Sequence, residues 1–228
     1  MILISLNLFY SIIFILILFF ISLFLKILDI KGSLISLAIG LDIALLGNFF
    51  MLFLLIIFVM VSFIFTRFRM EEKADGRNYT RSYQSVLSKG IVPALIVIFP
   101  MNVIEKETLF SVSVAAALSD TMAGEIGILS RDTFSIINFK KINRGENGGI
   151  SLIGEIAALT GSFIIAIFSL FFFNIDSYYF TIILIIGFLS SNIDSLLGGL
   201  FENRGILNKH EVNIISISLS LFIAFTLI

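Results

Sequence analysis

Apolar stretches of about twenty residues recur along almost the whole chain of 228 residues. Hydrophobic residues make up 58% of the chain and charged residues 14%, and the mean hydropathy is +1.10. Soluble domains do not have this composition. Since a helix rises about 1.5 Å per residue and the hydrocarbon core is about 30 Å thick, such stretches can cross a bilayer. We therefore predict an all-α, polytopic transmembrane helix bundle that forms a single integral membrane domain over residues 1–228.

The apolar stretches divide the chain into about eight helices. We place them at Ile2–Leu25, Ser33–Leu46, Phe49–Thr66, Ser85–Ile104, Thr108–Leu129, Ile150–Phe173, Tyr178–Leu200 and Val212–Ile228. An alternative joins the second and third helices into one bent segment, which leaves seven crossings. It would put half of the basic junctions on the wrong side of the membrane, so the charge pattern favours eight.

Basic residues gather at alternate junctions between the predicted helices. They follow the first, third, fifth and seventh helices, and Lys106, between Glu105 and Glu107, is the exception. Because cytoplasmic loops of membrane proteins carry an excess of Lys and Arg, both termini should face outward and the basic loops should lie in the cytoplasm. We expect an integral protein of the cell membrane.

Two acids interrupt the fifth apolar stretch, Leu109–Leu129. Asp120 and Glu125 lie in its later half. Inserting an ionisable side chain into a membrane helix costs at least about 2.5 kcal/mol, so we treat such residues as functional candidates. They are about 140° apart around an ideal helix and need not share a ligand. The alternative for each acid is a structural ion pair or an interhelical hydrogen bond.

Other polar residues fall near the same predicted membrane face. Asp194 lies late in the seventh helix and Glu155 early in the sixth, whereas the outward halves of the fifth and seventh helices carry no acid or base. His210 lies in a polar loop, where we expect it to be solvated. The absence of cysteine excludes thiolate metal sites and cysteine nucleophiles. We predict one ionic site at the cytoplasmic face.

The segment before the sixth helix has the composition of a phosphate-binding loop. It ends in N-R-G-E-N-G-G-I-S-L-I-G-E, and we expect its glycines and the free N–H groups that open the helix to hold phosphate. Basic residues of this loop lie beside the membrane acids, which suggests that the site binds a polyphosphate. Mg²⁺ would bridge the polyphosphate to the carboxylates, since it binds one or two carboxylates together with substrate phosphates.

Four strings resemble one multi-pass family in their order along the chain. They are R-S-Y-Q-S-V-L-S-K-G-I-V-P-A-L from Arg81, A-A-A-L-S-D-T-M-A-G-E-I-G from Ala115, G-E-N-G-G-I-S-L-I-G from Gly145 and I-D-S-L-L-G-G from Ile193. The family includes the plastid phytyl-phosphate kinase and its archaeal and bacterial relatives, and the resemblance covers residues 32–213.

A looser similarity links D-T-M-A-G-E-I-G to dolichol kinases and phosphatidate cytidylyltransferases. The K-T-x-E-G loop of those enzymes is replaced here by Gly145–Gly149, without the lysine and threonine. The K-R pair that follows the late aspartate in the cytidylyltransferases is replaced by Gly198 and Gly199, which disfavours cytidylyl transfer.

The resemblance implies phosphorylation of a prenyl monophosphate, such as phytyl or geranylgeranyl phosphate, to the diphosphate, with Mg²⁺ and a nucleoside triphosphate, CTP by this similarity. The expected catalytic residues are Asp120, Asp194, Lys89 and Arg81. Magnesium would be held by Asp120, Asp194, Glu125 and Glu155. Donor nucleotide is assigned to Asn147, Gly148, Gly149, Arg144 and Thr121, and acceptor phosphate to Arg81, Ser82, Gln84, Lys89 and Asn213.

Three other functions stay open at this point. An ion-coupled transporter would use the same buried acids and would need a polar path to the outer face. A CTP-dependent polyprenol kinase would share the donor but not the acceptor. A scaffold would bind no nucleotide and would leave the buried acids unexplained. The expected partners are the lipid substrate, the nucleoside triphosphate and the bilayer, and no nucleic acid is expected. The sequence contains neither a Walker A motif nor a Rossmann fingerprint.

Overall fold

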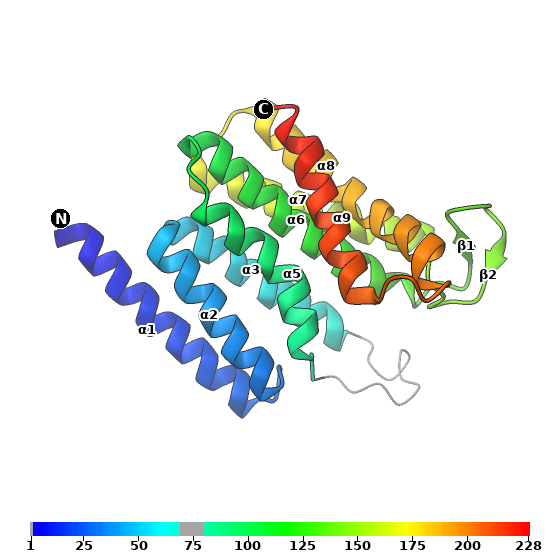
Figure 1. The fold of residues 1–228 in the computed structure, drawn as a ribbon, viewed down its shortest axis with the longest axis horizontal. Helices are drawn as coiled ribbons and strands as arrows, with labels where there is room; N and C mark the ends of the chain where they lie inside the picture. Colours follow the sequence, from blue (N-terminus) through cyan, green and yellow to red (C-terminus); the bar gives the residue numbers. More distant parts are fainter. Residues whose placement is uncertain (1, 69–79) are drawn as a thin grey trace.

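The structure is a computed structural model that describes residues 2–68 and 80–228, with side chains from Leu8 onward. Within this part of the chain it contains eight α-helices (Figure 1), which confirms the all-α membrane bundle. The helices are α1 (Ile2–Phe24), α2 (Ile30–Leu46), α3 (Phe49–Arg67), α5 (Tyr83–Ile98), α6 (Val103–Gly127), α7 (Leu152–Phe173), α8 (Ser177–Leu197) and α9 (Lys209–Phe225). A π-helical turn, η1 (Gly198–Glu202), continues α8.

Four of these helical segments are long and apolar enough to cross a membrane by themselves, namely α3, α6, α7 and the continuous segment Ser177–Glu202. The helices α2 and α3 are separate, because Gly47 and Asn48 break the chain between them and the Asn48 side chain caps α3. The bent seven-helix alternative is therefore wrong.

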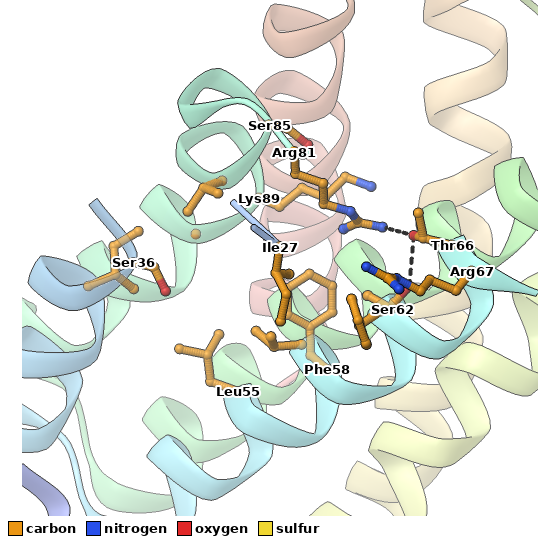
Figure 2. A pocket seen from close by; sticks show the side chains of 15 residues that line it. Ile27, Ser36, Leu55, Phe58, Ser62, Thr66, Arg67, Arg81, Ser85 and Lys89 are labelled. Carbon is orange, nitrogen blue, oxygen red and sulfur yellow. Dashed lines mark hydrogen bonds between the residues drawn. The ribbon is translucent and has the colours of Figure 1, made fainter. Parts of the chain in front are cut away.

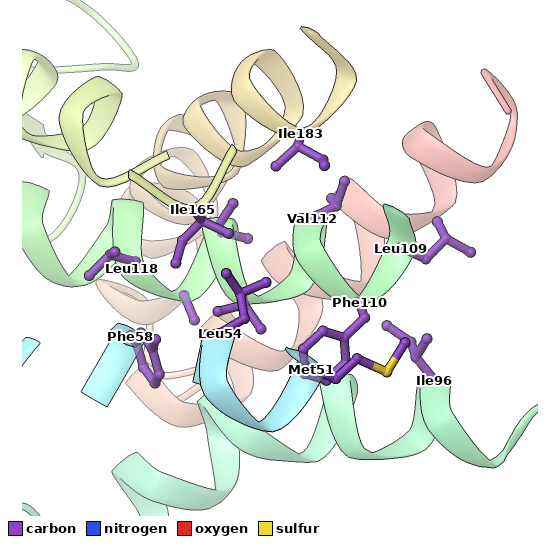
Figure 3. Close-up of a cluster of buried hydrophobic side chains, with 14 of the residues drawn as sticks. Met51, Leu54, Phe58, Ile96, Leu109, Phe110, Val112, Leu118, Ile165 and Ile183 are labelled. Carbon is purple, nitrogen blue, oxygen red and sulfur yellow. The ribbon is translucent and has the colours of Figure 1, made fainter. Parts of the chain in front are cut away.

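Helix α6 forms the centre of the bundle and contacts α3, α5, α7, α8 and α9. Every residue from Thr108 to Ser119 is buried. The helix is rich in Ala and Ser, which let neighbouring backbones approach closely and supply hydrogen bonds between helices. Ser119 Oγ donates to the Ala158 carbonyl at 2.9 Å, and larger side chains such as Phe110 fill the surrounding core (Figure 3).

Successive junctions alternate between two ends of the bundle (Figure 1). At one end, Thr80 Oγ1 donates to the Lys26 carbonyl and Thr66 Oγ1 donates to Glu125. At the other end, Asn48 Nδ2 donates to Glu107 Oε1 at 3.0 Å. The basic junctions thus share one end, as their alternation along the sequence predicted; Arg69, Lys73 and Arg77 lie outside the described residues. Which end faces the cytoplasm stays a prediction.

The predicted boundary between the fourth and fifth helices was wrong by five to six residues, about a turn and a half. Helix α5 ends at Ile98 and α6 begins at Val103, capped by Asn102, whose Oδ1 accepts from the Glu105 N–H at 2.9 Å. Glu105, Lys106 and Glu107 therefore belong to the start of α6 rather than to a loop, because acids are stabilised at a helix N-terminus. The prediction that the outward half of this helix carries no acid or base is wrong for these three residues.

The segment between α6 and α7 is a small antiparallel sheet and not only a loop. Its strands are β1 (Thr133–Ser135), β2 (Lys141–Ile142) and β3 (Gly149–Ile150), in the order β2-β1-β3. Helix α7 begins at Leu152 and is capped by Ser151, whose Oγ accepts from the Gly154 N–H. The predicted start of this helix at Ile150 was therefore two residues early, and Gly148 and Gly149 lie in the preceding segment, as expected.

Gly187 of α8 provides a test of close packing around α6. A Cβ at this position would lie 2.5 Å from Ser162 Oγ and 2.6 Å from Ala115 Cβ. We expect Gly187→Ala to destabilise the protein by about 1 to 3 kcal/mol, as overpacking does. The melting temperature in detergent should fall. Gly124→Ala is the matched control, because a Cβ at Gly124 would meet no heavy atom within 4 Å; an equal loss in both variants would contradict the packing argument.

Candidate functional site

A cleft of about 370 Å³ opens at the end of the bundle where the basic junctions gather. Its walls come from α3, α5, α6, the sheet segment, α7, α8, η1 and α9, so residues far apart in the sequence meet there. Most of the residues singled out from the sequence line this one cleft: Arg81, Lys89, Asp120, Thr121, Glu125, Asn147, Gly148, Gly149, Glu155, Asp194 and Asn213.

An ion pair between Lys89 of α5 and Asp120 of α6 lies at the inner wall of the cleft. Lys89 Nζ donates to Asp120 Oδ2 at 2.6 Å and to Thr121 Oγ1 at 2.6 Å. The two charged side chains are only 10% and 23% exposed. A charge at this depth is costly unless it is paired, so the ion pair lowers the free-energy cost of burying each of the two charges.

Asp194 of α8 lies next to this pair. Its carboxyl group is close enough to Asp120 for the two groups to act on each other electrostatically, and its Oδ1 accepts a hydrogen bond from Ser216 Oγ of α9 at 2.9 Å. Lys209, also on α9, is close enough to act electrostatically on both carboxyl groups. Two adjacent carboxylates repel each other, so a cation beside both of them lowers the energy of the arrangement.

The other two predicted metal ligands have partners of their own. Glu125 accepts a hydrogen bond from Thr66 and Glu155 accepts one from Asn192 Nδ2, each at 3.0 Å. Among the described residues no group of three or more acids, histidines or cysteines is arranged to hold a metal ion. The geometry thus sets Asp120 and Asp194 apart as an adjacent pair and does not gather the four predicted carboxylates into one cluster.

Arg81 reaches the cleft from the segment before α5. Its guanidinium donates to Thr66 Oγ1 and lies 3.8 Å from Glu125 Oε1. Its backbone is held by the connection between α1 and α2, because Arg81 N–H donates to Ile27 O and Arg81 O accepts from Asp29 N–H. Burial lowers the pKa of the guanidinium, which Glu125 and Asp120 raise again; arginine remains cationic at neutral pH.

The glycines of the sheet segment are required for backbone contact with η1. Gly148 has a φ of +80°, and a Cβ there would lie 2.7 Å from Gly199 Cα. The Asn203 side chain also donates to the Asn147 carbonyl at 3.2 Å. These contacts bring the Asn147–Gly149 backbone to the edge of the cleft. The Gly149 N–H already donates to Glu146 O, so this N–H is engaged within its own turn.

Three predicted residues do not line the cleft. Ser82 is the N-cap of α5 and accepts from the Ser85 N–H, while the Gln84 and Arg144 side chains are exposed. The structure therefore assigns Ser82 a local role at the helix start.

The first turn of α9 adds residues that were not expected in the site from the sequence. Lys209 and His210 line the cleft, and His210 Nδ1 is buried without a hydrogen-bond partner among the described residues, which corrects its expected solvation. Asn213 is 3% exposed, and its Oδ1 is likewise unpartnered among those residues. The capping box of Asn208 and Glu211 could have located this turn, since it marks a helix start and sets Lys209 and Asn213 one turn apart.

Comparison with known proteins agrees with the membrane architecture. The family model described as "Integral membrane protein DUF92" matches residues 13–220. The uncharacterized membrane protein MJ0933 of Methanocaldococcus jannaschii is 31% identical over 194 residues, which cover 83% of this chain and 81% of that protein. No solved structure matches the chain.

A plant relative is also similar. Protein VTE6, chloroplastic, of Arabidopsis thaliana is 30% identical over 161 residues, which make up 67% of this chain and 48% of that protein, so the chain spans about half of its length. The multi-pass membrane family expected from the motifs is confirmed, since the family match extends over nearly the whole sequence. This chain belongs to the integral membrane family DUF92.

Proposed function

We propose that this protein transfers the γ-phosphoryl group of a nucleoside triphosphate to a prenyl monophosphate and so forms the prenyl diphosphate. The observation that carries the proposal is the meeting of Asp120 and Asp194 with the cations Lys89 and Arg81 in one cleft of a membrane bundle. Support also comes from the motif resemblance to the family of the plastid phytyl-phosphate kinase and from the chloroplast relative.

The chemistry requires charge neutralisation and alignment more than a catalytic base. The second pKa of a phosphate monoester is about 6, so the acceptor is largely ionised near neutral pH and attacks without losing a proton to a side chain. An oxygen of the acceptor phosphate forms a bond to the γ-phosphorus while the bond to the β–γ bridging oxygen breaks and the nucleoside diphosphate leaves. The protein must hold both phosphates in line.

The basic residues of the cleft are placed for this task. Lys89 Nζ has three N–H groups, of which two donate to Asp120 and Thr121, so one remains for a phosphate oxygen in the cleft. Arg81 can make paired contacts with phosphate because its guanidinium presents a planar fork. We assign both to the acceptor and transferring phosphates, with Lys209 and Asn213 closing the site from α9.

Asp120 and Asp194 are the residues that fit a magnesium ion. Adjacent carboxylates next to room for phosphate match the coordination that Mg²⁺ prefers, namely one or two carboxylates together with substrate oxygens and water. When bound, the ion supplies positive charge against the phosphates. Asn147, Gly148 and Gly149 border the donor side, and the choice of CTP rests on the looser similarity to CTP-dependent lipid kinases.

An ion-coupled transporter is a weaker candidate. It requires a polar path that continues beyond the acids to the far end of the bundle. Between Glu107 and Asp120, α6 carries twelve buried residues without an ionisable side chain, a distance of about 18 Å along the helix. The hydroxyls of Ser111, Ser113 and Ser119 in this stretch donate to backbone carbonyls of the bundle. The carboxylates thus serve the cleft at one end.

Replacement of Asp120 tests the catalytic assignment. We expect Asp120→Asn to lower kcat for phosphorylation of geranylgeranyl phosphate by CTP and Mg²⁺ at least about 100-fold, since it removes a charge that stabilises the reacting groups. Asp132→Asn is the control, because Asp132 is an exposed carboxylate paired with Lys141 outside the cleft. Full activity of folded Asp120→Asn protein, with folding checked by its melting temperature, would refute the assignment.

Nucleotide binding can be measured without the lipid. We expect CTP with Mg²⁺ to raise the melting temperature of the purified protein, because a ligand that binds only the folded state stabilises it. Mg²⁺ or CTP alone should have a smaller effect, since the carboxylates repel a bare triphosphate. Absence of stabilisation by any nucleoside triphosphate, with or without Mg²⁺, would favour a transporter or a scaffold.

A further inference from the structure

We propose that an apolar groove between α2, α3 and α5 binds the hydrocarbon chain of the lipid substrate and limits its length. This inference rests on the proposed function and specifies where the tail of the substrate lies. The groove has a cavity of about 80 Å³, and apolar side chains such as Ile27, Leu55 and Phe58 line it (Figure 2).

The groove and the polar cleft share one boundary. Thr66, Arg81, Ser85 and Lys89 line both of them. In Figure 2 the cationic groups of Arg81 and Lys89 lie at one side of the groove and Leu55 and Phe58 lie at the other. The combined site has a cationic end that continues into an apolar channel. This is the shape and charge distribution that an anionic amphiphile requires.

The groove follows α3 and has a side that faces the membrane. Its lining runs along this helix from Leu55 to Arg67, which is about 18 Å at the rise of an α-helix. Val59 also lines the groove and is 44% exposed, so the wall is open to the surrounding hydrocarbon. A prenyl chain can therefore enter from the bilayer without crossing water, while its phosphate remains at Arg81 and Lys89.

Small residues keep the groove open in a chain that is otherwise rich in large apolar side chains. Ser36, Ser62 and Gly90 line it, and a Cβ at Gly90 would lie 2.5 Å from Ile39 Cδ1. The Ser62 hydroxyl is buried without a hydrogen-bond partner among the described residues. Because the groove is open to the bilayer, a hydrocarbon chain can occupy the space that these small residues leave.

Leu55 is the position at which to change the length of the groove, because it lies three helical turns from the cationic end. The test compares phosphorylation of geranyl, farnesyl and geranylgeranyl monophosphate by Leu55→Trp and Leu55→Ala. We expect Leu55→Trp to lower kcat/KM for the longest chain by about tenfold relative to the shortest, since pocket contacts discriminate apolar groups by such factors. Leu55→Ala should shift the preference toward longer chains.

The matched controls are Met60→Trp and Met60→Ala. Met60 is on the same helix, is 58% exposed and does not line the groove. These variants should keep the chain-length preference of the unaltered protein. An unchanged preference in both Leu55 variants, with normal melting temperatures, would overturn the proposal.

A second measurement reports binding without turnover. A prenyl monophosphate with a diazirine at the end of its chain is photo-crosslinked to the unaltered protein in detergent, and the labelled peptides are identified by mass spectrometry. Labels within α2, α3 and α5 are expected. Labels elsewhere would overturn the proposal, and so would a reduction of labelling by phosphatidylglycerol equal to that by an unlabelled prenyl monophosphate. If labelling falls in the groove but no prenyl phosphate is phosphorylated, the kinase function fails while the lipid-phosphate site stands.

Discussion

The ion pair between Lys89 and Asp120 is the interaction on which the organisation of this protein depends. It joins α5 to α6 at 2.6 Å in surroundings where an unpaired charge is expensive. Because a buried pair gains little stability over apolar residues of the same size, its presence in an apolar bundle indicates function rather than reinforcement. Asp194 and Lys209 extend the pair into a group of two acidic and two basic side chains. Under the proposed function, these side chains exchange partners when phosphate binds.

The central helix α6 makes that arrangement possible. Its Ala and Ser residues allow α7 and α8 to pack closely around it, which brings Asp194 of α8 to Asp120. This tightly packed half of the bundle holds the carboxylates, while α2, α3 and α5 enclose the more open apolar groove. Arg81 lies where cleft and groove meet, and its backbone is fixed to the α1–α2 connection. The division suits a reaction between a water-soluble donor and a lipid acceptor, because a substrate anchored in the groove would present its phosphate to the cleft without leaving the bilayer.

Sequence alone determined the helical class and the alternation of the junctions, because a bilayer demands long apolar helices and places basic residues on one side. It also singled out Asp120 and Asp194, since acids are rare in such helices. It misplaced the start of α6, because Glu105–Glu107 read as a loop when they belong to the first turns of a capped helix.

Only the tertiary structure decided which polar residues act together. Glu125 and Glu155 resemble Asp120 in sequence, yet each is engaged by a different neighbour, Thr66 and Asn192 respectively. Lys209 and His210 enter the cleft from a helix start that looked like a solvated loop, and Gly148 meets Gly199 across 51 positions of sequence. These pairings depend on how helices distant in sequence pack around α6. Local periodicity and charge assign a residue to one end of the bundle, but they do not determine which neighbour it contacts.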